Sequence, residues 1–406
     1  MSFFKQTIAT VPLDGQTVLL RADYNVPLEE DGTIADDFRI RASVPTVQAL
    51  LDRGCKVVII SHLGRPKGRD PKLSLEPVAT RLAELLGQPV RFVDQTVGDK
   101  VAMAVKKAPN RSVIMLENLR FYAGEEANEM GFAKQLATDS GARYFVQDGF
   151  GVVHRAHAST SAITLMLPSV AGLLLEREYT TITSVMKTPE HPLVAVLGGA
   201  KVSDKISVIE AFIKIANKII ITGVMANTFL AYKKQPTGKS KLEPDQEAVI
   251  DSIYEAAKKR EGIDTIDDFI ILPQDVAVGR TVDKDEPRRN VSINDVAPDD
   301  IILDIGDESI ERMVGLVEKS KTVVWSGTLG MAELPNFAHG SARLALTMAT
   351  NPQITSVVGG GDTVDFVLGW DARHGDSFTH VSTGGSASLE LMAGQKLPGI
   401  ESLLDA

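Results

Sequence analysis

The 406-residue sequence lacks most of the features that mark secreted, membrane and nucleic-acid-binding proteins. It contains one cysteine, Cys55, so an internal disulfide is excluded and a reducing compartment is indicated. No stretch approaches the roughly 20 apolar residues of a membrane span, and the first residues, MSFFKQTIATVPLDG, lack the apolar core of a secretory signal. The formal net charge of −10 argues against a nucleic-acid-binding surface. We therefore expect a cytoplasmic protein that binds neither nucleic acid nor a membrane.

Two common nucleotide-binding signatures are also missing. The sequence has no GxxxxGK[ST] loop, and neither half begins with a GxGxxG turn followed by an acidic residue about 20 positions later. These absences argue against a standard P-loop and against a dehydrogenase of the Rossmann type. Cys55 lies beside the apolar residues 57–60, so we interpret it as a core residue rather than a reactive thiol.

What the sequence does contain is a regular alternation of short apolar runs and longer periodic segments, which is typical of parallel βα units. The chain is too long for one ordinary core, so we expect two domains. The predicted strands are residues 17–22, 56–61, 90–93, 112–116 and 143–147, and then residues 194–197, 218–222, 269–272, 322–325, 356–358 and 380–382. Predicted helices include residues 38–53, 76–86, 97–107, 202–216, 244–260, 336–349 and 386–393.

One further long helix, over residues 171–187, is expected to connect the two sets of strands, because a proline-containing break follows it at residues 188–192. We therefore predict two doubly wound parallel-sheet α/β domains, residues 1–170 and 191–389. An interdomain helix and hinge at residues 171–190 would join them, with a cleft between the domains. The polar residues 279–289 are expected to form a solvated loop or hairpin.

Polar residues recur directly after the predicted strands, and open parallel sheets bind their ligands at the carboxyl ends of strands. In the first domain this edge is basic. The basic residues near its strand ends are Arg39, His62, Arg65, Arg120 and Arg155. Arginine binds carboxylate and phosphate through paired, charge-assisted hydrogen bonds. The set indicates a small polyanion, with Asp23 and Asn25 available for its hydroxyl groups, although any one arginine alone is more simply a surface ion pair.

The HRAH segment contains His154 and His157, and two histidines this close raise the possibility of a metal site. A third ligand at suitable spacing is missing, so we expect structural or anion-contacting roles instead.

Residues 194–205, VAVLGGAKVSDK, end an apolar run at two glycines and place Lys201 and Lys205 where a helix would begin. Glycines let a ligand approach the backbone, and a helix N-terminus offers unpaired N–H groups and a partial positive charge. Lysines four positions apart share one face of a helix. On this motif alone, a phosphate site and an ordinary strand–turn–helix corner both remain open.

The second domain also contains the run GGGDT, in which three glycines end a strand and Asp362 and Thr363 open a helix. Such a turn presents backbone amides to phosphates while Asp362 holds Mg²⁺, although Asp362 could equally be a helix cap. Glu333 could accept hydrogen bonds from a ribose or simply be an exposed glutamate.

Seven motifs resemble those of phosphoglycerate kinases, in the same order and along nearly the whole chain. They are RADYNVP at residues 21–27, SHLGRP at 61–66, LENLRF at 116–121, DGFGVVHRAHAST at 148–160, GGAKVSDK at 198–205, GGGDT at 359–363 and STGGSASLE at 382–390. Any one motif could arise by chance, whereas seven in order make the resemblance highly specific.

The resemblance implies a glycolytic kinase that transfers a phosphoryl group reversibly from 1,3-bisphosphoglycerate to MgADP, giving 3-phosphoglycerate and MgATP. It also implies a monomer whose C-terminal segment, residues 390–406, returns to the first domain. By motif position, phosphoglycerate would contact Asp23, Asn25, Arg39, His62, Gly64, Arg65, Arg120 and Arg155. The nucleotide would contact Lys201, Lys205, Gly223, Glu333, Gly360, Gly361, Asp362 and Thr363, with Asp362 on the Mg²⁺ that the phosphates carry.

This chemistry needs no general base, because a carboxylate is already the nucleophile when ATP is consumed. Direct in-line transfer then requires alignment of donor and acceptor and stabilisation of charge on the moving phosphoryl group. We assign that stabilisation to Arg39, Lys201 and Lys205. Because these residues fall in different predicted domains, we expect hinge-bending closure to assemble the catalytic site.

Departures from the usual family pattern gather on the nucleotide side. Ser326 and Thr328 replace the usual asparagine and proline, Val224 stands where a third glycine is common, and Ser386 replaces the last glycine of TGGG. They leave the nucleotide preference open without removing a charge that the chemistry needs. A non-catalytic phosphometabolite-binding protein would explain the arginines, but not the joint presence of the two lysines and the GGGDT run.

Overall fold

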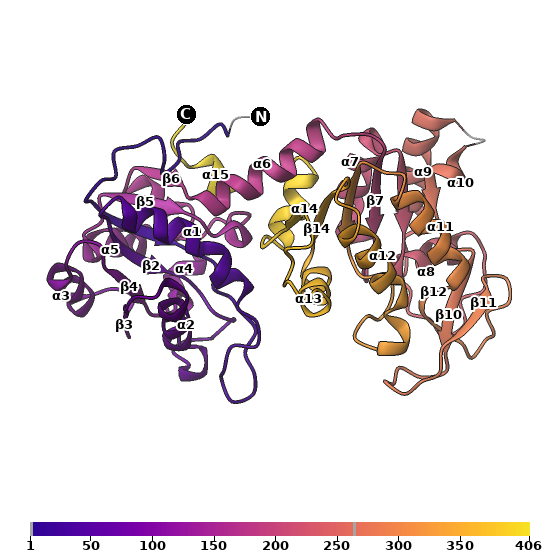
Figure 1. The fold of residues 1–406 in the computed structure, drawn as a ribbon, viewed down its shortest axis with the longest axis horizontal. Coiled ribbons are helices and arrows are strands. Elements are labelled where there is room, and N and C mark those ends of the chain that lie inside the picture. Colours follow the sequence, from indigo (N-terminus) through magenta and orange to yellow (C-terminus); the bar gives the residue numbers. More distant parts are fainter. Residues whose placement is uncertain (1–2, 263–264) are drawn as a thin grey trace. The chain divides into compact units, whose positions relative to one another are not determined.

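The structure is a computed structural model that describes residues 3–262 and 265–406, and the chain forms two compact units (Figure 1). Unit 1 comprises Met1–Thr180 together with Lys396–Ala406, and unit 2 comprises Thr181–Gln395. The division between the units falls inside one helix, α6 (Leu173–Lys187).

Unit 1 is built on a six-stranded parallel sheet with the strand order β3-β4-β2-β1-β5-β6. Its strands are β1 (Thr17–Arg21), β2 (Lys56–Ile60), β3 (Val90–Val93), β4 (Val113–Leu116), β5 (Tyr144–Gln147) and β6 (Ser169–Ala171). Its helices are α1 (Phe38–Asp52), α2 (Glu76–Leu86), α3 (Asp99–Lys107), α4 (Ala123–Glu126), α5 (Met130–Ser140) and α15 (Pro398–Glu401), with short 3₁₀ turns η1 (Pro71–Leu73), η2 (Leu119–Phe121), η3 (Phe150–Val152) and η4 (Ala162–Leu165).

Alternate residues of the central strands enter two separate hydrophobic cores, because successive side chains of a strand point to opposite faces. Leu20 of β1 belongs to the core that contains Leu50 of α1 and Leu82 of α2. Its neighbour Leu19 belongs to the other core, with Leu136 of α5. Both faces of the sheet are therefore covered at its centre, which explains why the central strands β1, β2 and β4 consist mostly of consecutive apolar residues.

The C-terminal segment lies against the N-terminal residues and β6 in unit 1 (Figure 1). Lys5 pairs with Asp405 in an isolated antiparallel bridge, and its buried ammonium donates to the backbone carbonyls of Glu401 and Leu403 at 2.8 and 3.0 Å. Gly399 contacts Val153 so closely that a Cβ at this position would lie 2.9 Å from the Val153 Cα. The returning segment begins at Lys396, later than the expected residue 390, because residues 386–392 form helix α14 in unit 2.

Helix α6 begins at Leu173, so the expected helix start at residue 171 was wrong: Ala171 is the last residue of strand β6. The buried carboxylate of Asp148 marks this start. Its Oδ1 accepts hydrogen bonds from the backbone N–H groups of Leu174 and Leu175 at 3.0 and 3.4 Å. Among the described residues, its Oδ2 has no hydrogen-bond partner. Burial raises the pKa of Asp148 to about 7.

The raised pKa of Asp148 predicts a specific pH dependence of stability. Between roughly pH 4 and pH 7 the folded protein binds more protons at this site than the unfolded chain does, so stability falls as pH rises through that window. Asp148→Asn keeps the acceptor oxygen and removes the charge. We expect it to raise the midpoint of thermal unfolding at pH 8 and to flatten this part of the pH profile. An unchanged pH profile in this variant would contradict the assignment.

Unit 2 repeats the architecture with a six-stranded parallel sheet of order β15-β14-β13-β7-β8-β9. The strands are β7 (Leu193–Leu197), β8 (Lys218–Ile221), β9 (Ile270–Ile271), β13 (Thr322–Ser326), β14 (Thr355–Gly359) and β15 (His380–Val381). The helices are α7 (Ile206–Ile215), α8 (Gly223–Tyr232), α9 (Glu247–Glu261), α10 (Ile266–Phe269), α11 (Asp307–Val317), α12 (His339–Ala349), α13 (Gly361–Trp370) and α14 (Ser386–Met392), with 3₁₀ turns η5 (Ser203–Lys205) and η6 (Pro335–Phe337).

A separate antiparallel sheet in unit 2, of order β11-β10-β12, was not predicted from the sequence. Its strands are β10 (Asp275–Gly279), β11 (Arg289–Ser292) and β12 (Ile301–Ile305). The residues between Gly279 and Arg289 connect β10 to β11, as expected for the hairpin alternative. Arg288 forms ion pairs with the buried Asp304 and with Asp307, at 3.1 and 3.0 Å, and so ties the sheet to helix α11.

The helix expected over residues 202–216 begins later in the structure. The 3₁₀ turn Ser203–Lys205 precedes α7, which starts at Ile206. Glu243 accounts for part of the difference, because its carboxylate accepts hydrogen bonds from the backbone N–H groups of Val202 and Ser203 at 2.5 and 3.2 Å. Lys201 therefore lies outside the helix, and the two lysines do not share a helical face as the spacing predicted.

Candidate active site

The predicted phosphoglycerate residues of unit 1 gather at the carboxyl ends of four adjacent strands, β4, β2, β1 and β5. This is the edge where open parallel sheets bind their ligands. Asp23 and Asn25 follow β1, His62 and Gly64 follow β2, and Arg120 lies in the 3₁₀ turn after β4.

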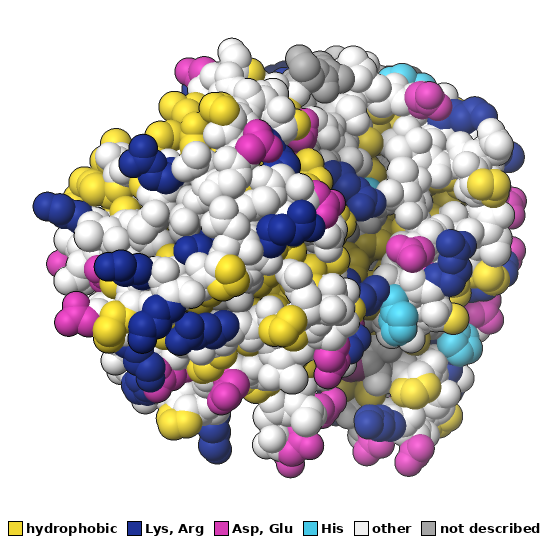
Figure 2. Space-filling view, turned by 60° about the vertical axis from the view of Figure 1, so that its left-hand side comes forward, with side chains coloured by type: hydrophobic (Ala, Val, Ile, Leu, Met, Phe, Trp, Pro, Cys, Tyr) yellow, Lys and Arg dark blue, Asp and Glu magenta, His cyan; other side chains and the backbone are white. Residues whose placement is uncertain are grey.

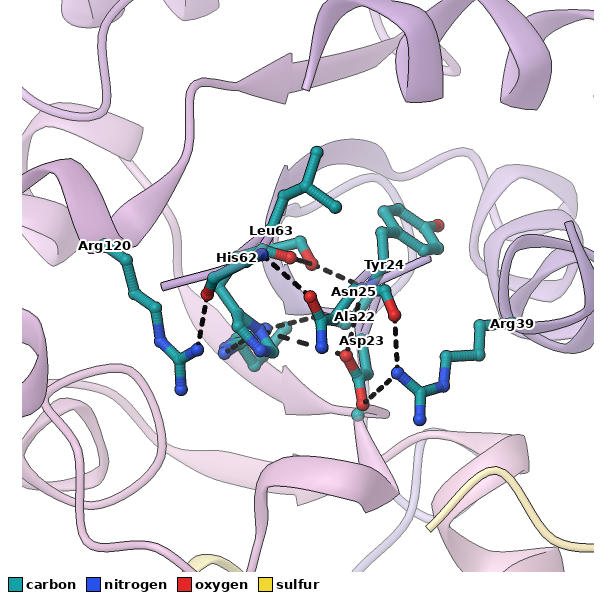
Figure 3. A network of polar contacts seen from close by, with 12 residues as sticks. Ala22, Asp23, Tyr24, Asn25, Arg39, His62, Leu63 and Arg120 are labelled. Atoms are coloured by element: carbon teal, nitrogen blue, oxygen red, sulfur yellow. Dashed lines mark hydrogen bonds and ion pairs between the residues drawn. The ribbon is translucent and has the colours of Figure 1, made fainter. Parts of the chain in front are cut away.

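Asn25 links the loops after β1 and β2 and also contacts α1. Its side-chain Oδ1 accepts a hydrogen bond from Gly64 N at 2.8 Å, and its backbone carbonyl accepts one from Arg39 Nη1 at 2.6 Å. The same guanidinium lies 3.8 Å from Asp23 Oδ2. Figure 3 shows Arg39 and Arg120 approaching this group from opposite sides. Arg39 is half-buried and keeps other N–H donors for a ligand.

Arg120 is buried and held in place, since its Nη1 donates to Gly64 O at 2.6 Å and its Nε lies 3.1 Å from Glu126 Oε1 (Figure 3). Arg155 is half-buried and donates from Nε to His154 Nε2 at 3.0 Å. Arg65 is exposed. The structure therefore brings Arg39, Arg120 and Arg155 to one edge and leaves Arg65 the least constrained of the four.

His62 lies at the centre of this positive charge. Its side chain is buried, and desolvation together with Arg21, Arg120, Arg39 and Arg155 lowers its pKa well below the ordinary histidine value. It is therefore neutral at physiological pH, and the site's positive charge comes from its arginines. Such a cluster of cations with few carboxylates in reach suits a small polyanion.

A buried group beneath these residues was missed by sequence reasoning. Arg21, the last residue of β1, is 1% exposed and donates from Nε to Ser159 Oγ at 2.8 Å. Glu125 of α4, with a fully buried side chain, lies 3.9 Å from Arg21 and accepts hydrogen bonds from Ser159 N and Oγ at 3.0 and 2.5 Å. One signal in the sequence could have indicated it, namely a charged residue at the end of an otherwise apolar strand.

In unit 2 a cavity of about 690 Å³ lies among the loops that follow β7, β8, β13 and β14. Gly199, Gly223, Glu333 and Asp362, all at or beside predicted nucleotide positions, line it. Apolar side chains supply much of the remaining wall, including Leu303, Met331 and Phe366. A mostly apolar wall with a few polar groups is typical of a small-molecule site.

Close backbone packing explains the glycines at this edge. A Cβ on Gly198 would lie 2.3 Å from Thr328 O, and one on Gly327 would lie 2.2 Å from Gly198 C. A Cβ on Gly223 would lie 3.0 Å from Gly199 N, and Gly223 has a left-handed φ of 64°. Glycine is required where chains approach this closely, so these loops bring backbone amides to the cavity.

The two lysines of residues 194–205 have different environments. Lys205 is 8% exposed, and its ammonium donates to Gly198 O at 2.6 Å, to Ser326 O at 2.7 Å and to Ser326 Oγ at 3.3 Å. Burial lowers the pKa of Lys205 to about 8. Lys201 is exposed and lies near enough to Glu243 to help lower the pKa of that carboxyl. Lys205 is therefore fixed at the strand ends by three hydrogen bonds, whereas Lys201 is exposed.

Helix α13 directs its N-terminus toward the cavity. Thr363 is fully buried and its Oγ1 accepts a hydrogen bond from Gly327 N at 2.6 Å, which joins the loops after β13 and β14. Gly360, with a φ of 90°, precedes the helix, and Gly361 and Asp362 form its exposed first turn. Unpaired N–H groups at a helix N-terminus are suited to phosphate.

The carboxylate donors fit Mg²⁺ that arrives on nucleotide phosphates rather than a metal held by protein alone. Within the described part of the chain, no three His, Cys, Asp or Glu side chains gather as a metal site. Asp362 in the first turn of α13 is one of the exposed carboxylates that line the cavity, together with Asp365 and Glu333. Mg²⁺ in nucleotide sites is usually bound by one or two carboxylates together with phosphate oxygens.

The four departures from the family pattern occupy different places. Val224 and Thr328 line the cavity, whereas Ser326 is fully buried at the end of β13 beside Lys205. Ser386 begins α14, and the structure gives no reason to connect it with the cavity. Three of the four therefore lie where they can affect nucleotide binding.

The outer surface carries both signs of charge. Figure 2 shows Lys and Arg side chains interspersed with Asp and Glu side chains over one face, as 43 basic and 53 acidic residues lead one to expect. No helix formed by residues 3–262 and 265–406 is long and apolar enough to cross a membrane.

Comparisons with known proteins agree on one family. A family model described as phosphoglycerate kinase matches residues 8–395. A phosphoglycerate kinase of Dictyoglomus turgidum is 43% identical over 395 residues, which cover 97% of this chain and 96% of that protein. One of Synechococcus sp. strain JA-3-3Ab is 44% identical over 420 residues, covering 99% and 100%. Among solved structures, phosphoglycerate kinase from Coxiella burnetii has a TM-score of 0.83 at 32% identity and covers 98% of each chain. The enzyme from Pyrococcus horikoshii has the same score and coverage at 29% identity.

Proposed function

The chain belongs to the phosphoglycerate kinase family, and on this basis we propose which residues bind each substrate and which stabilise the transferred phosphoryl group. The resemblance inferred from seven motifs is confirmed, as is the expected pair of parallel-sheet α/β domains. The enzyme is a kinase of glycolysis that transfers a phosphoryl group reversibly between 1,3-bisphosphoglycerate and ADP.

Unit 1 binds the phosphoglycerate at the strand-end group described above. Arg39 and Arg120 supply charge-assisted hydrogen bonds to its anionic groups, and Arg155 adds positive charge beside them. Asp23 and Asn25, which neighbouring loops hold in place, form hydrogen bonds with the hydroxyl group of phosphoglycerate. The single observation that supports this assignment is that the loops after β1 and β2 hold two arginines at one strand-end edge, where Arg39 donates to Asn25 O and Arg120 donates to Gly64 O.

Unit 2 binds the nucleotide in its glycine-walled cavity. The apolar wall takes the base, Glu333 accepts hydrogen bonds from the ribose, and the α13 N-terminus with Gly360 and Gly361 takes the phosphates. Asp362 would hold the Mg²⁺ that accompanies them, and the ion neutralises phosphate charge when it is bound. We propose that the protein is cytoplasmic. We also propose that it is a monomer, because its two units must be free to move.

Catalysis follows from charge rather than from proton transfer. Arg39 on unit 1 and Lys205 on unit 2 stabilise the phosphoryl group as it moves between two anionic oxygens, and the exposed Lys201 joins them once nucleotide is bound. Since these residues belong to different units, movement of the units brings them to one substrate.

A pair of binding measurements tests this division. We expect Arg120→Gln to weaken 3-phosphoglycerate binding roughly 10- to 100-fold, because a hydrogen bond to a charged group is lost, and to leave MgADP binding unchanged. Asp362→Asn should weaken MgADP binding roughly 10-fold by losing a metal ligand and leave 3-phosphoglycerate binding unchanged. Titration calorimetry on the full chain measures both constants.

Two exposed positions provide matched controls for these variants. Arg91→Gln on β3 and Asp376→Asn after α13 make the same chemical changes away from both sites. They should bind both ligands as the wild type does. The proposed division is wrong if Arg120→Gln weakens MgADP binding as much as it weakens 3-phosphoglycerate binding. It is also wrong if Asp362→Asn weakens 3-phosphoglycerate binding as much as it weakens MgADP binding.

A further inference from the structure

The contact between Arg21 and His62 restricts which nitrogen of the imidazole carries the proton. Arg21 Nη2 lies 3.2 Å from His62 Nδ1, within hydrogen-bond distance. A guanidinium has only donors, so Nδ1 must offer its lone pair and cannot bear a hydrogen. In a neutral imidazole the proton then has to be on Nε2.

The surroundings of His62 do not compete with this contact. Asp23 is the carboxylate nearest to Nδ1, but its Oδ1 lies 3.9 Å away, beyond hydrogen-bond distance. The other charged groups that act on the ring are Arg39, Arg120 and Arg155, all of which oppose protonation. Among residues 3–262 and 265–406, no hydrogen bond to His62 Nε2 is found, which leaves its N–H for a ligand.

Arg21 is itself fixed from three directions. Its Nη1 donates to the backbone carbonyl of Ala22, its Nε donates to Ser159 Oγ, and its charge is compensated by the buried Glu125. Glu125 in turn holds Ser159 through two hydrogen bonds. A guanidinium clamped in this way has little freedom to leave Nδ1 and let the ring rotate or change tautomer.

We propose that Arg21 is a positioning residue for the kinase reaction, because it holds His62 as a neutral imidazole with its single proton on Nε2. His62 is then a donor in one direction only and accepts nothing from the substrate. It supplies a hydrogen bond to an anionic oxygen of phosphoglycerate without adding a charge that titrates. This inference rests on the proposed assignment of His62 to the phosphoglycerate site, and Arg21 acts through His62 rather than by contacting substrate.

The arrangement has a chemical consequence for recognition. An imidazole free to exchange its proton between both nitrogens could face the ligand with a lone pair, and an anionic ligand would be repelled by it. Fixing the tautomer removes that state, so the site pays no free energy at binding to select the donor form. The hydrogen bond should also be independent of pH across the range in which ordinary histidines titrate.

Nitrogen NMR of the full chain labelled at histidine tests the inference directly. His62 is assigned by comparison with His62→Gln. In the ligand-free wild type we expect an unprotonated Nδ1 and a protonated Nε2, unchanged from about pH 5 to about pH 9, which brackets the ordinary histidine pKa. A proton on Nδ1, a tautomer mixture, or titration of His62 near neutral pH would overturn the proposal without any substitution at Arg21.

A set of variants tests whether Arg21 is what fixes the tautomer of His62. Arg21→Met alone leaves the buried Glu125 without its partner, so the double variant Arg21→Met/Glu125→Gln is the preferred test, with Glu125→Gln alone as its matched control. We expect the double variant to show a tautomer mixture and a His62 that titrates at higher pH. Its affinity for 3-phosphoglycerate should fall roughly 10-fold, with MgADP affinity unchanged.

The outcomes separate this inference from the proposed function. If the folded double variant keeps the wild-type nitrogen signals and the wild-type 3-phosphoglycerate affinity, Arg21 does not position His62 and the inference is wrong. If 3-phosphoglycerate leaves the His62 signals of the wild type unmoved, the assignment of His62 to the substrate site fails instead. The tautomer measured without ligand then still reports on Arg21 alone.

Discussion

Replacing Arg39 with alanine should lower kcat by roughly 100- to 1,000-fold, the usual loss for one preorganised donor to transition-state charge. Nucleotide affinity should change little, because Arg39 belongs to unit 1 and the cavity to unit 2. The fold should survive, since the half-buried guanidinium makes one hydrogen bond, to the Asn25 carbonyl, and one longer ion pair, to Asp23.

Steady-state rates in both directions and MgADP titration provide the measurement. Arg41→Ala, two residues along the same helix, is the matched control. Arg41 forms an i,i+4 ion pair with Asp37, and neither residue belongs to the proposed phosphoglycerate site. We expect it to keep nearly the wild-type rate. A wild-type kcat in Arg39→Ala would show that Arg39 does not stabilise the transferred group.

Lys205→Met should produce the second large effect, a loss of roughly 100- to 1,000-fold in kcat. Methionine has a similar length and no charge, so it removes the ammonium that the carbonyls of Gly198 and Ser326 hold at the strand ends. A preorganised charge contributes most to catalysis, because it does not have to reorganise as the reaction proceeds. Lys201→Met removes the same charge from an exposed, less constrained side chain, so its effect should be smaller.

Comparing kcat of the two lysine variants tests whether the buried, hydrogen-bonded Lys205 contributes more to catalysis than the exposed Lys201. Equal losses in kcat would show that burial and fixed hydrogen bonds do not distinguish the lysines. A larger loss in Lys201→Met would mean that the exposed lysine is the principal catalytic cation. Circular dichroism of both variants checks that they keep the secondary structure of the wild type.

The strands were predictable from the sequence because both faces of a doubly wound sheet are buried. Every predicted strand has a counterpart in the structure, and apolar runs make up residues 18–20 of β1, 57–60 of β2 and 113–116 of β4. Strand β11 could not be found in this way. Its residues Arg289–Ser292 are exposed or half-buried and polar, so hydropathy gave no signal, and its pairing with β10 depends on tertiary context.

Spacing alone also failed where a distant side chain decides local structure. The interval between Lys201 and Lys205 predicted one helical face, but Glu243 binds the intervening backbone and delays α7 to Ile206. In the same way, Asp148 follows β5 in sequence but acts at the start of α6. Contacts across more than 20 residues cannot be inferred from periodicity.

The sequence predicted that polar residues gather at one strand-end edge, and the structure brings them there, whereas the groups that hold them were not predicted. That these residues bind substrate stays a proposal. Asp23, Asn25 and His62 stand out because polar residues at strand ends suggest binding. Arg21 and Glu125 are buried and come from β1 and the short helix α4, so only the folded structure places them together. The tautomer that we propose for His62 follows from the contact of Arg21 Nη2 with His62 Nδ1, which could not be inferred from the sequence either.

We propose that this chain catalyses phosphoryl transfer with two sets of ligand-binding residues, one on each unit. A coupled assay with 3-phosphoglycerate and MgATP tests it most directly, with the dissociation constant of each ligand measured on the same preparation. We expect turnover that saturates in both substrates and is lost when either is omitted. Binding of both ligands without turnover would contradict the account and would indicate a phosphometabolite-binding protein instead.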